Sequence, residues 1–400
     1  MPWARSRALM PRTSIVVALI LVARVKYRIM IPGGSWVVRS ALGFAIAAVS
    51  PHSAPATAAP LREEDIIGTR QISLEILGTG ECIPGRRVHS EELDLQLGKP
   101  RGWTLKHTGV ESRAFADEGE DAVSMGTIAA KQALGNANIE GRELDAIIAV
   151  GSVPAQPIPC TAAFLQRALD LSTSGIAAFD VNATCLGFIA ALDLVAQAIA
   201  TGRYRTVLIV ASERPSVGLD WKDPATAGLF GDGAGAVVVG CARRPGAALL
   251  ATHFQTFSDG VEFCQMRSGG TNIHPRLRPE EFLAGTVFEM RGRHVYRLAA
   301  ERLPAFLDTL LERAGVTSHD IVTWVPHQAS GHALTHIQNA LGLRAEQLVL
   351  TLPTRGNQVA ASLPIALHHA FICSRTPRGA IVAVVGTGAG LSIGGAVLRI

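Results

Sequence analysis

The stretch FDVNATCLGFIA, residues 179–190, decides how the fold of this chain is predicted. A short apolar run, residues 175–179, leads into it, and a long apolar segment with helical spacing, residues 186–199, follows. These patterns predict a strand that turns sharply into a helix, with Cys185 at or near the first turn of that helix. Backbone N–H groups there lack partners and the helix dipole is positive, so a thiolate is favoured at that position.

Cys185 has two interpretations at this point. A thiol whose pKa is lowered becomes a nucleophile, which is the functional interpretation. The alternative is a small core residue, which is the commoner fate of a single cysteine. The remainder of the chain has to decide between them.

Composition indicates a large globular protein. The chain has 400 residues, enough for two to three domain-sized units, and 48% of them are hydrophobic while 18% are charged. Its six cysteines are scattered without a Cys-x-x-Cys pair. This pattern argues against a zinc site and against a disulfide framework, and it is typical of a reducing compartment.

The net charge of +4 is confined to one end of the chain. Residues 1–71 hold nine Lys and Arg against three Asp and Glu, whereas the remaining residues hold 28 against 30. The body of the protein therefore has no charge bias of the kind that indicates nucleic acid binding, and no nucleic acid partner is expected.

Residues 1–71 are predicted to be an N-terminal extension. Their apolar runs, residues 15–23 and 41–49, are shorter than the roughly 20 residues of a membrane helix, so no membrane association is expected. The second run and the Ala-Thr-Ala at 56–58 resemble a secretory signal. We favour a disordered extension, or upstream sequence joined by a wrongly assigned start.

From residue 71 onward, expected strands and helices alternate, which predicts a layered α/β fold. The expected strands are residues 72–77, 144–150, 207–211, 236–239 and 321–325, and the expected helices are residues 122–137, 162–169 and 359–370.

An internal repeat suggests a duplication. Residues 129–150 and 304–325 share one pattern: a helix, a short polar turn, an acidic residue and a buried strand. We therefore expect two halves, residues 72–245 and 246–400. Cys185 and the turn at 356–362 then fall at comparable places, facing the seam between the halves, where sites commonly form.

Two further residues could join Cys185. His327 directly follows an expected strand and Pro326, a position where a histidine is more often structural than catalytic. Asn357 lies in a Gly-Asn turn before a helix of small residues, and such a turn is usually only a turn. Taken together, a Cys nucleophile and two N–H donors suit chemistry at a thioester carbonyl.

From about Ser73 to Ile400, the chain resembles the β-ketoacyl-acyl carrier protein synthase III family of the thiolase-like condensing-enzyme superfamily. The motifs that carry the resemblance are LGTGECIP (77–84), GWTLKHTGV (102–110), DVNATCLGF (180–188), FGDGAGAVVV (230–239), VPHQAS (325–330), RGNQVAAS (355–362) and GTGAGLSIGGAVL (386–398).

The resemblance implies a five-layered α-β-α-β-α fold made from two duplicated halves. It implies a catalytic triad of Cys185, His327 and Asn357, and an oxyanion hole made by the backbone N–H groups of Cys185 and Ala389. It also implies a cytoplasmic homodimer that needs no metal or redox cofactor.

The activity implied is that of an acyltransferase in fatty acid or related lipid or polyketide biosynthesis. Cys185 takes an acyl group from an acyl-CoA, and a malonyl thioester then enters, carried on acyl carrier protein or CoA. His327 and Asn357 stabilise the enolate that remains when carbon dioxide leaves. The carbanion attacks the acyl group on Cys185 and gives a β-ketoacyl thioester.

Several positions depart from the family pattern, and they concern substrate binding. His107 and His332 replace arginines that help to grip CoA or the carrier protein, while Trp103 matches the aromatic residue that contacts the CoA adenine. Ile158 stands where a bulky aromatic from the dimer partner usually ends the acyl pocket, and Leu186 replaces a small residue. We infer a pocket for medium or branched acyl chains.

Three alternatives use the same residues: an acyltransferase with an oxygen or nitrogen acceptor, an enzyme that condenses two acyl chains head to head, and a silent partner subunit. An intact triad argues against the last. Gly78-x-Gly80 after an expected strand hints at a dinucleotide fingerprint, but the third glycine is misplaced.

Overall fold

The computed structural model describes residues 27–30, 36–39, 71–372 and 376–400. The chain divides into two units, Met1–Arg62 and Glu63–Ile400. In the first unit, β1 (Tyr27–Met30) and β2 (Trp36–Arg39) pair as antiparallel strands, which the sequence did not predict. Apart from these strands and Gln71, the predictions for residues 1–71 lie outside the described residues.

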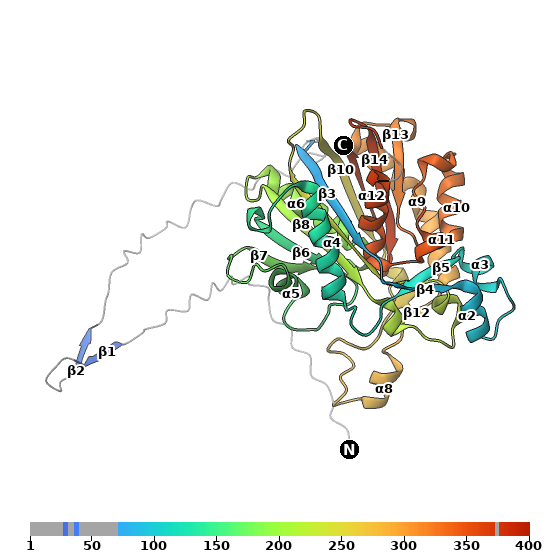
Figure 1. Ribbon diagram of the computed structural model, residues 1–400, viewed down its shortest axis with the longest axis horizontal. Coiled ribbons are helices and arrows are strands. Elements are labelled where there is room, and N and C mark those ends of the chain that lie inside the picture. The colour runs from blue at the N-terminus through green and yellow to red at the C-terminus, as the bar shows by residue number, and fades with distance from the viewer. Residues whose placement is uncertain (1–26, 31–35, 40–70, 373–375) are drawn as a thin grey trace, which may run out of the picture. The chain divides into compact units, whose positions relative to one another are not determined.

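Two β-sheets form the framework of the second unit (Figure 1). The first sheet has the strand order β3-β9-β8-β6-β7, with parallel pairs at β6–β7 and β6–β8 and antiparallel pairs elsewhere. Its strands are β3 (Leu74–Cys82), β6 (Ala146–Val150), β7 (Ala177–Val181), β8 (Thr206–Glu213) and β9 (Gly233–Cys241).

The second sheet has the order β10-β15-β14-β13. Its strands are β10 (Ala248–Thr256), β13 (Ile321–Pro326), β14 (Ile381–Gly388) and β15 (Ser392–Arg399). An isolated bridge joins the two sheets at their edges, where the N–H of Ile72 donates to the carbonyl of Leu249 at 3.0 Å and the reverse bond measures 2.9 Å.

Two helices lie between the sheets, α6 (Gly187–Ala200) and α12 (Ser362–Ile372), and each contacts strands of both sheets. Their side chains, such as Phe188 and Leu363, share one core cluster with the inner faces of the strands. Because this layer lies between the sheets, α6 and α12 are apolar over most of their surface, and α12 is buried along nearly its whole length.

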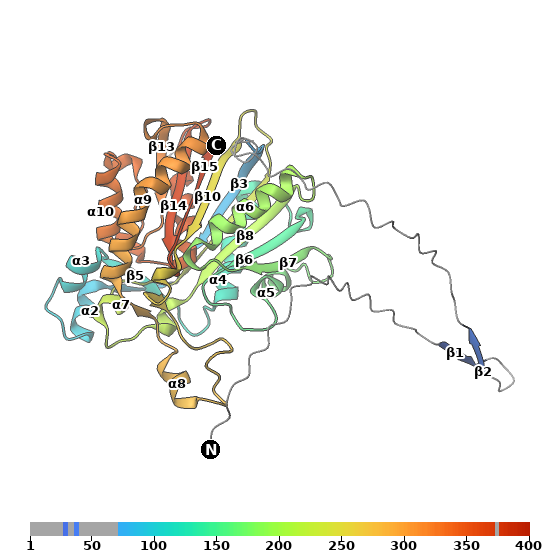
Figure 2. The same ribbon diagram turned by 180° about the vertical axis from the view of Figure 1, so that it is seen from behind.

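The outer faces of the sheets are covered by further helices (Figures 1 and 2). α4 (Ala122–Ala137) and α5 (Thr161–Ala168) pack on the first sheet, and α9 (Gly292–Ala314) packs on the second. The layers therefore follow the order α-β-α-β-α, which confirms the predicted architecture.

α4 approaches β3 closely because β3 carries glycines at the contact. Asp121 caps the start of α4 by accepting the N–H of Ser124 at 2.7 Å. A Cβ added at Gly78 would meet the carbonyl of Ala133, and one added at Gly80 would meet the carbonyl of Ala129. The Gly-x-Gly of β3 thus serves helix packing.

A smaller region covers one end of the sheets and brings residues 86–115 beside the C-terminal half (Figure 1). Its apolar side chains form a separate cluster that includes Leu93, Phe115 and Leu352. α10 (Gly331–Ala340) packs on the second sheet through Ile337 and on this smaller region through Leu334. The elements outside the layers are β4 (Arg86–His89), α2 (Ser90–Gln96), α3 (Trp103–Thr108), β5 (Ser112–Phe115), α7 (Pro224–Ala227), β11 (Cys264–Gln265), α8 (Pro279–Ala284), β12 (Glu289–Met290) and α11 (Leu352–Arg355).

Most predicted elements are confirmed, with shifted ends. The helix at 122–137 has the predicted bounds, whereas the strand predicted at 236–239 extends over Gly233–Cys241. The helix predicted at 359–370 starts later, because Val359–Ala361 forms a 3₁₀ turn, η7, ahead of α12.

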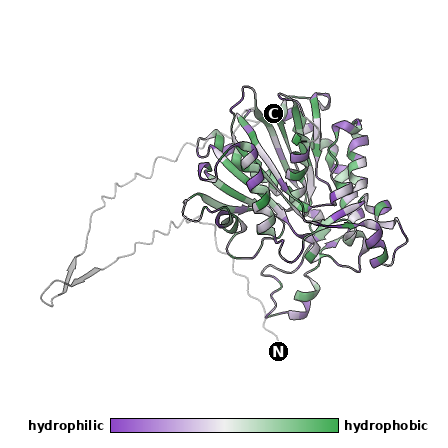
Figure 3. Ribbon diagram, in the orientation of Figure 1, coloured by the Kyte–Doolittle hydropathy of each residue, from purple (hydrophilic) through white to green (hydrophobic). Residues whose placement is uncertain are grey.

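Hydrophobic colouring concentrates on the strands and on the helices between them (Figure 3). β6 is buried at every position, AIIAV, which reflects a strand covered by helices on both faces. Within the described residues, every helix falls short of the length or apolar character needed to cross a membrane.

Candidate active site

Cys185 lies in a sharp turn between β7 and α6, as predicted. The turn is the 3₁₀ helix η2 (Thr184–Leu186), which leads directly into α6. Thr184 has a φ of 50°, in the left-handed region that non-glycine residues rarely adopt, and its N–H donates to the side chain of Asn182 at 2.9 Å. This strained turn fixes where the sulfur points.

The electrostatics of Cys185 differ from the prediction of a favoured thiolate. Burial raises the pKa of Cys185 to about 12, and the nearby groups Glu213 and Cys264 raise it further, while the N–H groups of Ala389 and of Cys185 itself lower it. Desolvation outweighs the helix start, so the prediction is wrong for the thiol as it stands in this structure. The Cys185 sulfur does lie close to the two predicted donors, the backbone N–H groups of Cys185 and Ala389.

His327 directly follows β13 and is 5% exposed. Its N–H donates to the carbonyl of Val385 at 2.8 Å, which extends the pairing of β13 with β14. Burial lowers the pKa of His327 to about 4, so the imidazole is neutral at neutral pH. Its Nδ1 atom has no hydrogen-bond partner among the described residues.

Asn357 is held between the two halves. Its N–H donates to the carbonyl of Leu229 at 2.9 Å, and its carbonyl accepts the N–H of Gly231 at 3.1 Å. Its Nδ2 donates to the carbonyl of Ala329 at 3.3 Å, two residues past His327, and its Oδ1 accepts the N–H of Val359 at 2.9 Å. One side-chain N–H remains available to a ligand.

The turns that carry Cys185 and Asn357 lie against each other, since η2 contacts η7 and both precede a central helix. Val359, which opens η7, has a φ of 51°, matching Thr184 at the start of η2. η2 also contacts β14, which pairs with the residue His327. The structure therefore brings the elements that carry the three predicted residues together at the seam.

Glycines make this approach possible from both sides. A Cβ added at Gly386 would lie 2.8 Å from the Cβ of His327 and 3.0 Å from Cδ2 of Leu186. A Cβ added at Gly231, before β9, would meet the carbonyl of Arg355. Each half thus presents a glycine-rich strand to the turn of the other half.

Trp103 and His107 lie on α3, which meets the start of α10, where His332 is exposed. The crossing places Gly109 against Gly331. The rings of Trp103 and His107 stack with centroids 4.1 Å apart, and His107 Nδ1 lies 2.7 Å from the carbonyl of Trp103. Three of the predicted binding residues are therefore carried by two neighbouring helices.

Ile158 and Leu186 lie in contrasting surroundings. Ile158 is 83% exposed, in the loop between β6 and α5. Leu186 is 0% exposed and packs against Gly386, Gly388 and Gly394 in the central core. The structure gives Leu186 a packing role beside the site, and a part in substrate binding stays a prediction for both residues.

Glu213 was missed by the sequence prediction. It ends β8, is 4% exposed, and its charge acts on Cys185. The expected strand stopped at residue 211. The available signal was an ionisable residue two positions after a buried apolar run. Cys264 also lies near Cys185, and nothing in its sequence context indicated this.

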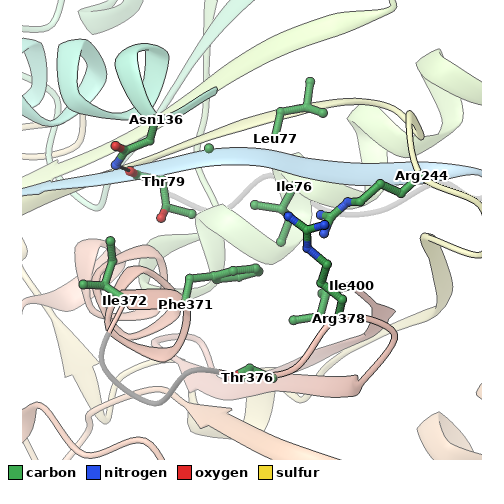
Figure 4. A pocket seen from close by; sticks show the side chains of 11 residues that line it. Ile76, Leu77, Thr79, Asn136, Arg244, Phe371, Ile372, Thr376, Arg378 and Ile400 are labelled. Carbon is green, nitrogen blue, oxygen red and sulfur yellow. Dashed lines mark hydrogen bonds between the residues drawn. The ribbon is translucent and has the colours of Figure 1, made fainter. Parts of the chain in front are cut away.

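Within residues 71–372 and 376–400, no three His, Cys, Asp or Glu side chains are grouped so that they could hold a metal ion. A cavity of about 390 Å³ lies between β3, which contributes Leu77 and Thr79, and the C-terminal end of α12 (Figure 4). Its lining includes Arg244, Arg378 and Phe371 and none of the predicted site residues.

A five-layered fold with a cysteine in the turn before one central helix and an asparagine in the turn before the other is typical of a condensing enzyme of the thiolase type. Comparison with known proteins narrows this class. Residues 179–259 match the family described as 3-oxoacyl-[acyl-carrier-protein (ACP)] synthase III, and residues 311–400 match the C-terminal part of that family.

Individual relatives agree with this match. The chain is 35% identical over 324 residues to β-ketoacyl-[acyl-carrier-protein] synthase III of Methylococcus capsulatus, covering 81% of this chain and 98% of the relative. It is 33% identical over 329 residues to the enzyme of the same name from Caldanaerobacter subterraneus subsp. tengcongensis, covering 82% and 98%.

A solved structure is similar throughout the second unit. The crystal structure of 3-oxoacyl-[acyl-carrier-protein] synthase III from Aquifex aeolicus VF5 superposes with a TM-score of 0.74 at 32% identity, covering 82% of this chain and 100% of that one. The chain belongs to the β-ketoacyl-acyl carrier protein synthase III family, and it is a condensing acyltransferase of the kind used in fatty acid biosynthesis.

Proposed function

We propose that Cys185 takes an acyl group from an acyl-CoA and that the acyl group is then condensed with a malonyl thioester on acyl carrier protein or CoA. The observation that carries this proposal is the meeting of η2 and η7 at the seam, with His327 hydrogen-bonded to the adjoining strand β14. No metal or redox cofactor takes part in the proposed steps.

The acylation step follows from the protonation states of Cys185 and His327. A thiol with a pKa of about 12 and an imidazole with a pKa of about 4 are both neutral in the resting enzyme and do not form an ion pair. The thiol proton therefore leaves as sulfur attacks the thioester carbon, and it ends on the departing CoA thiolate. In this proposal the N–H groups of Cys185 and Ala389, which lie at the sulfur, stabilise the tetrahedral oxyanion.

The condensation step uses His327 and Asn357 as neutral donors. With its Nε2 protonated, His327 donates to the malonyl thioester oxygen, and the free N–H of Asn357 donates to the same atom. Loss of carbon dioxide leaves an enolate whose carbon attacks the acyl carbonyl on Cys185. The new carbon–carbon bond forms as the Cys185 thiolate leaves and takes a proton from solvent.

Mass spectrometry of the intact protein after incubation with mixed acyl-CoAs tests this function. We expect an acyl adduct on the wild-type protein and none on Cys185→Ala. His327→Ala and Asn357→Ala should still be acylated but lose about 100-fold or more in malonyl decarboxylation, because each removes an oxyanion donor. An adduct of unchanged yield on Cys185→Ala would contradict the assignment of the nucleophile.

We infer that the acyl pocket takes medium or branched chains, because Ile158 is smaller than an aromatic residue at that position. Its exposed side chain is free to reach a second subunit. Profiling the mass adducts by acyl chain length tests this inference, and exclusive use of acetyl-CoA would rule it out.

We also infer that the protein is a cytoplasmic homodimer. β7 is an edge strand with no partner on its outer side within the described residues, and its Phe179 is 38% exposed. Unpaired edges of this kind invite pairing with another chain. The cytoplasmic location follows from the supply of acyl-CoA and carrier protein.

A further inference from the structure

Glu213 is a buried carboxylate that connects the two halves beside the site. Its Oε1 accepts the N–H of Ser152 at 2.6 Å and the N–H of Ala360 at 3.4 Å. Ser152 belongs to the loop that also carries Ile158, whereas Ala360 belongs to η7, directly after the Asn357 turn. One oxygen atom therefore joins a loop of the first half to a turn of the second.

Glu213 also acts on the nucleophile. Its negative charge raises the pKa of Cys185, in addition to burial. Burial raises the pKa of Glu213 itself to about 7, the charge of Asp232 raises it too, and the two N–H donors lower it. The titratable groups that face this region are Asp232 before β9, Cys185 on η2 and Cys264 on β11.

We propose that Glu213 is a positioning residue that ties the Ser152 loop to the Asn357 turn, and that its charge disfavours the thiolate of Cys185 in the resting enzyme. The proposal rests on the proposed function of Cys185 and Asn357. Glu213 does not touch the reacting atoms in this assignment; it acts through the two loops and through its charge.

A reactive free thiolate would be alkylated or oxidised between turnovers, because the thiolate is the nucleophilic form of cysteine. The charge of Glu213 disfavours that form, since like charges repel. Attack on a thioester ends with the negative charge on the substrate, held by the N–H groups of Cys185 and Ala389. Glu213 thus disfavours side reactions more than acyl transfer.

The test measures the rate at which iodoacetamide alkylates Cys185, read by peptide mass spectrometry between pH 6 and pH 9. This readout needs neither acyl-CoA nor malonyl thioester, so its failure is distinct from failure of the proposed function. Glu213→Gln keeps a carbonyl acceptor and removes the charge. We expect about tenfold faster alkylation than wild type at pH 9 and convergence toward the wild-type rate at pH 6, where Glu213 is protonated.

The matched control is Glu75→Gln. Glu75 is also buried, at 7% exposure, and it also accepts two backbone N–H groups, those of Arg243 and Arg244. Glu75 pairs with Gly240 at one end of β9, whereas Glu213 pairs with Gly233 at the other end. Glu75 is therefore remote from Glu213 along the sheet. In the Glu75→Gln variant, Cys185 should be alkylated at the wild-type rate at every pH.

A Glu213→Gln to wild-type rate ratio that is constant over pH would overturn the proposal, as would an equal effect of Glu75→Gln. If Glu213→Gln does not fold, the pH dependence of Cys185 alkylation in the wild-type protein tests the proposal by itself. Ionisation of Glu213 should flatten the plot of log rate against pH near pH 7, and a straight line of unit slope would overturn the assignment.

Amide hydrogen exchange tests the link between the two loops. Glu213→Ala removes the acceptor, so exchange at Ser152 and Ala360 should rise at least about tenfold, whereas Glu213→Gln should keep both amides protected. Unchanged exchange at both amides in Glu213→Ala would contradict the positioning role.

Discussion

Burial shifts the pKa values of the two central side chains of the site in opposite directions. It raises the pKa of the Cys185 thiol to about 12 and lowers the pKa of His327 to about 4, so both are neutral at neutral pH. The start of a helix can be predicted from local sequence, and with it the position of Cys185. Desolvation depends on what the other half packs against the sulfur, which local sequence does not contain.

The shifted pKa of His327 predicts how stability depends on pH. The unfolded chain binds a proton at this residue near pH 6.5 and the folded protein only near pH 4, so the folded state loses stability as pH falls through this window. At pH 5 the loss relative to pH 8 should be about 2 kcal/mol. Urea unfolding of wild type and His327→Gln at both values measures it.

His332→Gln serves as the control, because it removes an exposed imidazole and should keep the wild-type pH dependence. If His327→Gln loses as much stability between pH 8 and pH 5 as wild type does, the buried imidazole is not responsible for the effect.

At the scale of elements, periodicity predicted most strands and helices, and it failed where the backbone is irregular. Val359–Ala361 was included in a helix because its residues are apolar, but a positive φ at Val359 makes it a separate 3₁₀ turn. The motif Gly78-x-Gly80 could mark either a nucleotide site or a close contact. Only the position of α4 shows that it is a contact.

This contact gives a prediction for two glycines. Gly80→Ala should destabilise the protein by about 1–3 kcal/mol, because the added methyl group would meet the backbone of α4. Gly135→Ala, on the exposed face of the same helix, meets nothing within 4 Å and should stabilise by about 0.5–1 kcal/mol. Thermal melting of both variants checks the signs, and a Gly80→Ala protein as stable as wild type would contradict the close approach.

At the scale of the whole molecule, the resemblance predicted the five layers and the meeting of separate motifs at one seam. Glu213 could not be found in this way, because its role depends on the N–H groups of Ser152 and Ala360, far apart in sequence. The same limit applies to Leu186, whose neighbours in the core are glycines of β14 and β15.

The proposed dimer gives a prediction at this scale. Phe179→Asp places a charge on the unpaired edge of β7 and should convert the dimer to a monomer, because the charge would be buried without a partner. Leu95→Asp changes an apolar residue that is 84% exposed on α2 and should leave the dimer intact. Sedimentation velocity distinguishes the two, and a wild-type protein that sediments as a monomer would refute the dimer.

The close contacts that glycines of each half make with a turn of the other half constrain how this protein can evolve. A bulkier residue at Gly386 would require both His327 and Leu186 to give way, and a bulkier residue at Gly231 would require the Arg355 backbone to move. Mutations that survive on one side should therefore be matched by compensating changes on the other. A chimera built from two relatives should fold and be active only when each glycine-bearing segment and the turn that it contacts come from the same relative.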